Sequence, residues 1–63
     1  MRFLRRRELQ HKTGHHPAWL DKLEKQGKFP KRVKLGEKAV AWVEDEVDAW
    51  LKQKVAERDQ AAA

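Results

Sequence analysis

The sequence predicts a small, mainly helical α+β domain, a winged helix-turn-helix with three helices and a two-stranded β-hairpin as its wing. Three observations lead to this fold class. Apolar residues recur at helical spacing near residues 5–12, 17–26 and 44–58. Between the last two segments, residues 32–42 alternate between large apolar side chains and charged or small ones, which is the period of β-strands. The 63 residues include no cysteine, so packing alone must hold one small core.

The first helix is expected near residues 5–12, after an extended lead over residues 1–4 in which Phe3 or Leu4 packs against the core. Isolated helices shorter than about 12 residues are marginal in water, so tertiary contacts must hold it. Its start carries three adjacent arginines, of which at least one is expected to reach a phosphate if DNA is bound. The alternative for each is a solvated helix start. These residues are Arg5, Arg6 and Arg7.

Residues 14–30 are expected to form a turn, a short helix and a return. Gly14 permits a sharp reversal, and Pro17 suits the first position of a helix, where a missing amide proton costs nothing. The helix is expected over 17–26, and Gly27 ends it in a left-handed cap. A short helix, a glycine turn and a second helix with outward lysines form a helix-turn-helix, whose second helix usually enters the DNA major groove.

The hairpin is expected across residues 32–42, with a turn at 36–38, and Phe29 is expected to fill the space between the helices and the sheet. A hairpin is unstable alone, so one face must pack against the helices while the other forms a basic wing. The residues expected to face the core are Val33, Leu35, Val40 and Trp42, and those expected to face outward are Arg32, Lys34 and Lys38.

The third helix is expected from about Glu44 to Arg58. Acidic residues crowd its start and basic residues its end, which is the order that the helix dipole favours. Residues 59–63 lack an apolar stripe and are expected to form a flexible tail, which leaves residues 1–58 as the domain. The stripe expected to be buried consists of Val43, Val47, Trp50, Leu51 and Val55.

The charges are segregated along the chain, whose net charge is +5. Residues 1–42 carry 12 Lys and Arg against 4 Asp and Glu, a balance of +8, whereas residues 43–63 carry 3 against 6, a balance of −3. A merely soluble surface intersperses both signs, so this segregation favours a polyanionic partner such as duplex DNA. No apolar run approaches the roughly 20 residues of a membrane span. We therefore expect a cytoplasmic protein, nucleoid-associated when bound to DNA, with no membrane partner.

Several short segments form a combined signature over residues 4–58. They are Thr13-Gly14 at the turn, Gly27-Lys28-Phe29-Pro30 after the second helix, Val33-Lys34-Leu35-Gly36 in the wing, and Ala39-Val40-Ala41-Trp42 leading to Glu46-Val47-Asp48-Ala49-Trp50-Leu51. Together they resemble the AlpA family of small prophage regulators, relatives of phage excisionases with a MerR-type winged helix-turn-helix. The resemblance implies a DNA-binding protein that regulates transcription of prophage genes such as an integrase, or that acts architecturally in prophage excision.

The start of the second helix departs from that family. Where the family usually has a Ser-Arg-Ser-Thr type start followed by Tyr-Arg, this chain has His16-Pro17-Ala18-Trp19 and then Asp21-Lys22. An arginine and two hydroxyl groups expected near DNA are thus missing, and Asp21 adds a negative charge. Asp21 can accept a hydrogen bond from a cytosine amino group, repel phosphates, or pair with Lys25 four residues on.

The candidate DNA contacts lie on the second helix, its entry and exit, the wing and the first arginines, and their alternative is a solvated cationic face. Trp19 is expected either to pack partly in the core or to stand exposed, stacking on DNA or docking a protein. Histidines in the turn can donate to phosphates, whereas a metal site with His11 is not expected, because Gly14 breaks the helical spacing. The candidates are Arg5, Arg6, His15, His16, Ala18, Trp19, Lys22, Lys25, Lys28, Arg32, Lys34 and Lys38.

No catalytic constellation is present, because the chain has no cysteine, serine or tyrosine and no glycine-rich phosphate loop. We expect a non-enzymatic reader of duplex DNA without a cofactor, a prophage-type transcriptional regulator or excision factor. So small a reader contacts few base pairs, which implies repeated sites, a dimer or cooperative neighbours on the DNA. The alternative is a protein-binding module around Trp19 on a helix-turn-helix scaffold, and a third is a redesigned recognition helix.

Overall fold

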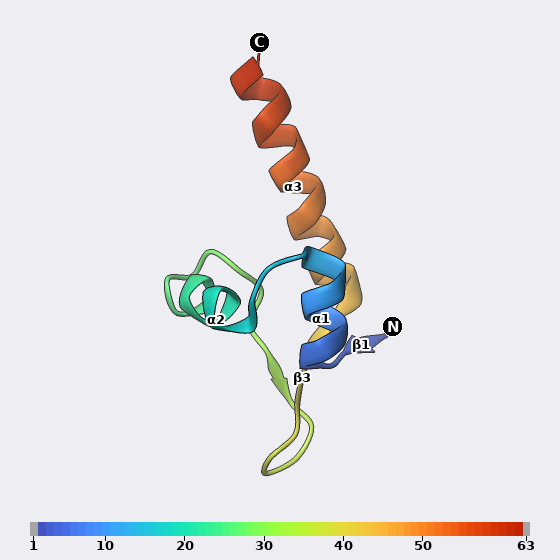
Figure 1. The fold of residues 1–63 in the computed structure, drawn as a ribbon. Helices are drawn as coiled ribbons and strands as arrows, with labels where there is room; N and C mark the ends of the chain where they lie inside the picture. Colours follow the sequence, from blue (N-terminus) through green and yellow to red (C-terminus); the bar gives the residue numbers. More distant parts are fainter. Residues whose placement is uncertain (1, 63) are drawn as a thin grey trace.

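The computed structural model describes residues 2–62, and its elements are arranged as Figure 1 shows. Three helices surround a three-stranded antiparallel sheet of strand order β1-β3-β2, which confirms the predicted winged helix-turn-helix of mainly helical class. The expectations for Met1 and Ala63 lie outside the described residues. The elements are β1 (Phe3–Leu4), α1 (Arg6–Thr13), α2 (Pro17–Lys25), β2 (Val33–Lys34), β3 (Val40–Val43) and α3 (Glu44–Ala62).

The sheet contains one strand more than the predicted hairpin. β1 pairs with β3 through Leu4 opposite Trp42, while β2 pairs with the other edge of β3 through Val33 opposite Ala41. Successive side chains of a strand point to opposite faces, so only one of the two β1 residues can enter the core. That residue is Leu4, which is buried, whereas Phe3 is exposed.

α1 runs from Arg6 to Thr13, which places each end one residue later than the expected range of 5–12. The Glu8 carboxylate accepts a hydrogen bond from the Arg5 backbone N–H at 3.1 Å, which satisfies a free donor at the helix start. Gly14 follows the helix with a φ of 74°, a left-handed conformation that glycine adopts without strain, and its N–H donates to the Gln10 carbonyl at 2.8 Å. The predicted glycine turn between α1 and α2 is therefore confirmed.

The core receives side chains from every helix and from the sheet. Trp42 is its largest member and is 1% exposed, and the ring of Phe29 meets Trp50 edge-on at a centroid distance of 4.9 Å. The prediction that Phe29 fills the space between the helices and the sheet is confirmed by its burial in the same cluster. The buried cluster consists of Leu4, Leu9, Leu20, Phe29, Trp42 and Val47, with Leu23, Val40, Trp50 and Leu51 packed partly buried against it.

The predicted inner face of the wing is wrong at Leu35. β2 ends at Lys34, and beyond it the hairpin projects past the helices, which leaves Leu35 47% exposed (Figure 1). Ala41, in the central strand, is fully buried although it was not among the expected inner residues. Of the other expected inner residues, Trp42 is buried, and Val33 and Val40 are half-buried.

α3 extends past its predicted end at Arg58 to Ala62. Most residues from 52 to 61 are strong helix formers, so the helix continues although these positions are exposed. Its second half projects from the body, away from the wing, so Val55 is 50% exposed and the buried stripe stops near Leu51 (Figure 1). Burial of Val55 is therefore a second prediction that the structure corrects. No helix within residues 2–62 is both long and apolar enough to cross a bilayer.

The acidic start of α3 also contacts α1. The Lys12 ammonium lies 2.7 Å from a carboxylate oxygen of Asp48 and 3.5 Å from one of Glu44. These contacts with Asp48 and Glu44 raise the Lys12 pKa, with desolvation opposing them. The acidic residues at the start of α3 are favoured by the helix dipole, and two of them also attach α1 to α3.

Two leucine truncations distinguish core from wing tip. We expect Leu9→Ala to lower the free energy of unfolding by about 2–5 kcal/mol, because it leaves a cavity at a side chain that is 1% exposed. Leu35→Ala removes the same atoms from a half-exposed position and should cost much less. Equilibrium urea unfolding measures both, and an equal loss in the two variants would place Leu35 in the core after all.

Candidate nucleic-acid interface

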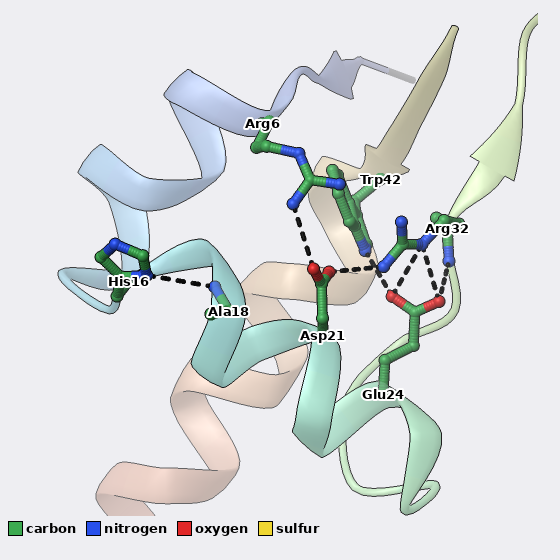
Figure 2. Close-up of polar contacts among 7 residues, drawn as sticks. All are labelled: Arg6, His16, Ala18, Asp21, Glu24, Arg32 and Trp42. Atoms are coloured by element: carbon green, nitrogen blue, oxygen red, sulfur yellow. Dashed lines mark hydrogen bonds and ion pairs between the residues drawn. The ribbon is translucent and has the colours of Figure 1, made fainter. Parts of the chain in front are cut away.

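The turn before α2 is held by a histidine cap. His16 has extended backbone angles, and its Nδ1 accepts a hydrogen bond from the Ala18 N–H at 3.2 Å, directly before Pro17 in the first helical position (Figure 2). An Nδ1 that accepts this bond carries no proton, so His16 has a structural role besides the predicted phosphate contact. The sequence held a signal for it, since a polar residue directly before a proline at a helix start is a candidate cap.

α2 turns four side chains to solvent, which we call the outer face of α2: Ala18, Trp19, Lys22 and Lys25. Leu20, on the opposite side, is buried, and Leu23 is half-buried. Trp19 is 47% exposed, and the Lys22 ammonium lies 5.6 Å from the centre of its ring, within cation–π range. Of the alternatives for Trp19, the structure therefore supports the exposed aromatic.

The two carboxylates of α2 point away from the outer face and bind arginines from distant segments, as Figure 2 shows. Asp21 accepts from the Nη1 of Arg6 at 3.2 Å and from the Nη2 of Arg32. Glu24 accepts from the Nε of Arg32, at 3.2 and 2.9 Å to its two oxygens, and from the Trp42 indole N–H at 3.2 Å. We call these five residues the Asp21–Glu24 network.

The indole ring of Trp42 contacts both arginines of this network. The guanidinium carbons of Arg32 and Arg6 lie 5.1 and 5.8 Å from the centre of its ring. Multidentate, partly buried arginine–carboxylate pairs are stronger than exposed pairs, and cation–π contacts add to them. Within residues 2–62, every buried side-chain nitrogen or oxygen has a hydrogen-bond partner. The network therefore joins α1, α2, the base of the wing and β3 without an unsatisfied buried side-chain polar atom.

The pairing keeps both charges of the Asp21–Arg32 contact ionised. Burial acts to raise the pKa of Asp21, but hydrogen bonds from Arg32 and Arg6 outweigh it and lower that pKa. The hydrogen bond to Glu24 raises the Arg32 pKa against an opposing effect of burial. The Asp21–Arg32 contact is thus a pair of opposite charges.

The network corrects the expected orientation of Arg32 and excludes one of the alternatives for Asp21. Arg32 was expected on the outward side of the wing, but it is half-buried at the base of the wing because two carboxylates of α2 accept its N–H groups. Asp21 pairs with Arg6 and Arg32 rather than with Lys25. Glu24 has a central role that the sequence interpretation missed, since its partners lie 8 and 18 residues further along the chain.

The other candidate residues are exposed. Among residues 2–62, no carboxylate oxygen lies within 4.0 Å of the cationic groups of Arg5, Lys22, Lys25, Lys28, Lys34 or Lys38, so their charges are available to a partner. His15, His16, Ala18 and Trp19 are exposed beside them. Arg6 differs, because it is exposed but already paired with Asp21. The structure thus separates a free cationic set from a paired one.

Comparison with known proteins gives two matches. Residues 2–55 match the model of the family described as prophage CP4-57 regulatory protein (AlpA). The uncharacterized protein ORF88 of Enterobacteria phage P4 is 42% identical to this chain over 57 residues, which cover 90% of this chain. The match spans 65% of the length of that relative.

The lowered pKa of Asp21 predicts an acid-sensitive contribution to stability. A carboxylate with a lowered folded-state pKa stabilises the fold fully above its unfolded pKa of about 3.9, and this contribution is lost as the pH falls through the folded value. Asp21→Asn removes it at every pH. We expect the variant to have a lower Tm than the parent at pH 7 and the gap to shrink below about pH 4.

Thermal unfolding followed by circular dichroism between pH 7 and pH 2.5 tests this dependence. Glu37→Gln is the matched control, because among the described residues no cationic group lies within 4.0 Å of this exposed wing carboxylate. It should leave the Tm nearly unchanged. A gap for Asp21→Asn that keeps its size over the whole pH range would contradict the proposed contribution.

The histidine cap predicts a second effect on stability. We expect His16→Ala to lower the free energy of unfolding by about 1 kcal/mol, because the Ala18 N–H loses its acceptor. His16→Ser restores an oxygen acceptor at the same position and should recover most of the loss. Urea unfolding near pH 7.5 compares the three proteins, and equal stability of the alanine and serine variants would rule out the cap.

Proposed function

The chain belongs to the AlpA family of prophage regulatory proteins, and we propose that it acts by binding duplex DNA, as a transcriptional regulator or excision factor. One observation carries this proposal. The two carboxylates of α2, Asp21 and Glu24, are bound by arginines on its inner side, so its outer face presents only neutral and cationic side chains. The guanidinium groups of Arg6 and Arg32 therefore offset the negative charge of Asp21 toward an approaching phosphate backbone.

In this proposal α2 enters the major groove, and the wing contacts the adjacent phosphate backbone of the DNA. Base edges meet the residues at the start of a recognition helix, whereas lysines at its end and in a wing hold phosphates. Arg6 and Arg32 do not contact DNA in this proposal. They position α2 and the base of the wing relative to each other through Asp21. The contacts that we propose are Arg5, His15, His16, Ala18, Trp19, Lys22, Lys25, Lys28, Lys34 and Lys38.

The half-exposed indole of Trp19 favours a second candidate function, a protein-binding module centred on that ring. Selection from a random duplex library at moderate salt separates the two candidates. Enrichment of a common sequence supports a DNA reader. Failure to enrich any sequence, together with no measurable affinity for mixed-sequence duplex, would overturn the proposal and favour the module.

Lysine truncations test the proposed phosphate contacts. We expect Lys25→Ala and Lys34→Ala to weaken DNA binding. For each variant, the loss of affinity should be about the same for a selected duplex and for a duplex of unrelated sequence. Each should also reduce the slope of log affinity against log salt by about 0.9, because one fewer counterion is released. Lys52→Ala on α3 removes the same charge outside the proposed interface and is the control. Fluorescence anisotropy titrations between 50 and 300 mM salt measure the slopes, and equal slopes for all three variants would contradict the assignment.

A further inference from the structure

The outer face of α2 has little capacity to hydrogen-bond base edges. In its first two turns, the exposed side chains are Ala18, Trp19 and Lys22. Asp21 and Glu24 are occupied by arginines, and the Nδ1 of His16 is occupied by the helix cap. Arginine, asparagine and glutamine, which make bidentate contacts to guanine and adenine, are absent from these two turns, and Lys22 is the one exposed side chain there that can donate to guanine. The other two exposed side chains, Ala18 and Trp19, can discriminate between bases by apolar contact.

The major groove offers one apolar feature, the C5-methyl group of thymine, and small or aromatic side chains contact it. The face holds an alanine methyl next to an indole that is 47% exposed. The Lys22 ammonium near the ring restrains the indole and adds positive charge beside it. An apolar pair flanked by unpaired lysines complements a groove whose floor carries methyl groups and whose walls carry phosphates.

We propose that Ala18 and Trp19 recognise thymine methyl groups, so that the DNA site contains thymines where the start of α2 meets the groove. This inference rests on the proposed DNA-binding function and assigns its sequence preference. Charge favours DNA over a protein partner at this surface, because Lys22 and Lys25 on the same face and Lys28 just after it lack carboxylate partners among the described residues.

The test replaces thymine by uracil, which keeps the base pairing and removes only the methyl group. The probe is a duplex enriched from the random library by the parent protein, with each thymine replaced in turn. We expect affinity to fall roughly three- to fivefold for each contacted thymine, the loss appropriate to one buried methyl group. The comparison needs no protein variant, so it does not depend on how a mutant folds.

Repeating the uracil substitutions with Trp19→Ala tests whether the indole contacts the methyl group. Because Trp19 lies outside the buried core, this variant should keep its circular dichroism spectrum and Tm, and the uracil penalty should disappear at the thymine that the ring contacts. Val55→Ala, at an equally exposed apolar side chain on α3, should keep the full penalty.

Each result decides between distinct conclusions. A uracil penalty that vanishes in Trp19→Ala supports the inference. A penalty that persists unchanged at every thymine in that variant shows that the ring contacts no methyl group and overturns the inference. An enriched site without thymines, or one that tolerates uracil, overturns the inference while leaving the proposed DNA binding intact. Absence of binding to any duplex overturns the DNA-binding proposal and this inference with it.

Discussion

The arrangement of this small domain depends on the pairing of two carboxylates of α2 with Arg6 and Arg32 above the ring of Trp42. The buried side chain of Leu20 sets which side of α2 faces the core. Hydrogen bonds to Asp21 and Glu24 add a directional constraint on the rotation of α2, because each carboxylate must meet donors in a defined direction. The same contacts attach the base of the wing to α2, so helix and wing are held as one unit.

This pairing also determines how the acidic residues of α2 bear on the proposed function. A carboxylate in a helix that faces DNA opposes binding, unless it is turned away and neutralised. Here Asp21 faces Arg6 and Arg32, which balance its charge together with that of Glu24. The cost is two cations withdrawn from the free set. The free lysines of α2 and the wing then carry the attraction to phosphates in the proposed function, and the apolar start of α2 carries its selectivity.

Much of the fold could be predicted from the sequence, because the signals were local: helical spacing, the glycine turn at Gly14 and the strand period near Trp42. β1 was missed as a strand because two residues are too few to show a period. Leu35 was misplaced because alternation continues in the sequence after the strand and its core have ended. The Asp21–Glu24 network could not be predicted from the sequence, because Asp21 pairs with residues 15 and 11 positions away that only the folded backbone brings together.

The projecting half of α3 has a consequence for the energetics of local opening. Its first two turns share the core through Val47, Trp50 and Leu51, whereas residues 52–61 are exposed, and the ion pairs Lys54–Glu57 and Arg58–Asp59 lie between neighbours on the same helix. Short solvated helical turns open at low free energy, because they bury little apolar surface. Protection of backbone amides against solvent exchange should therefore decline along this one helix, from values near global unfolding at Val47 to almost none beyond Arg58.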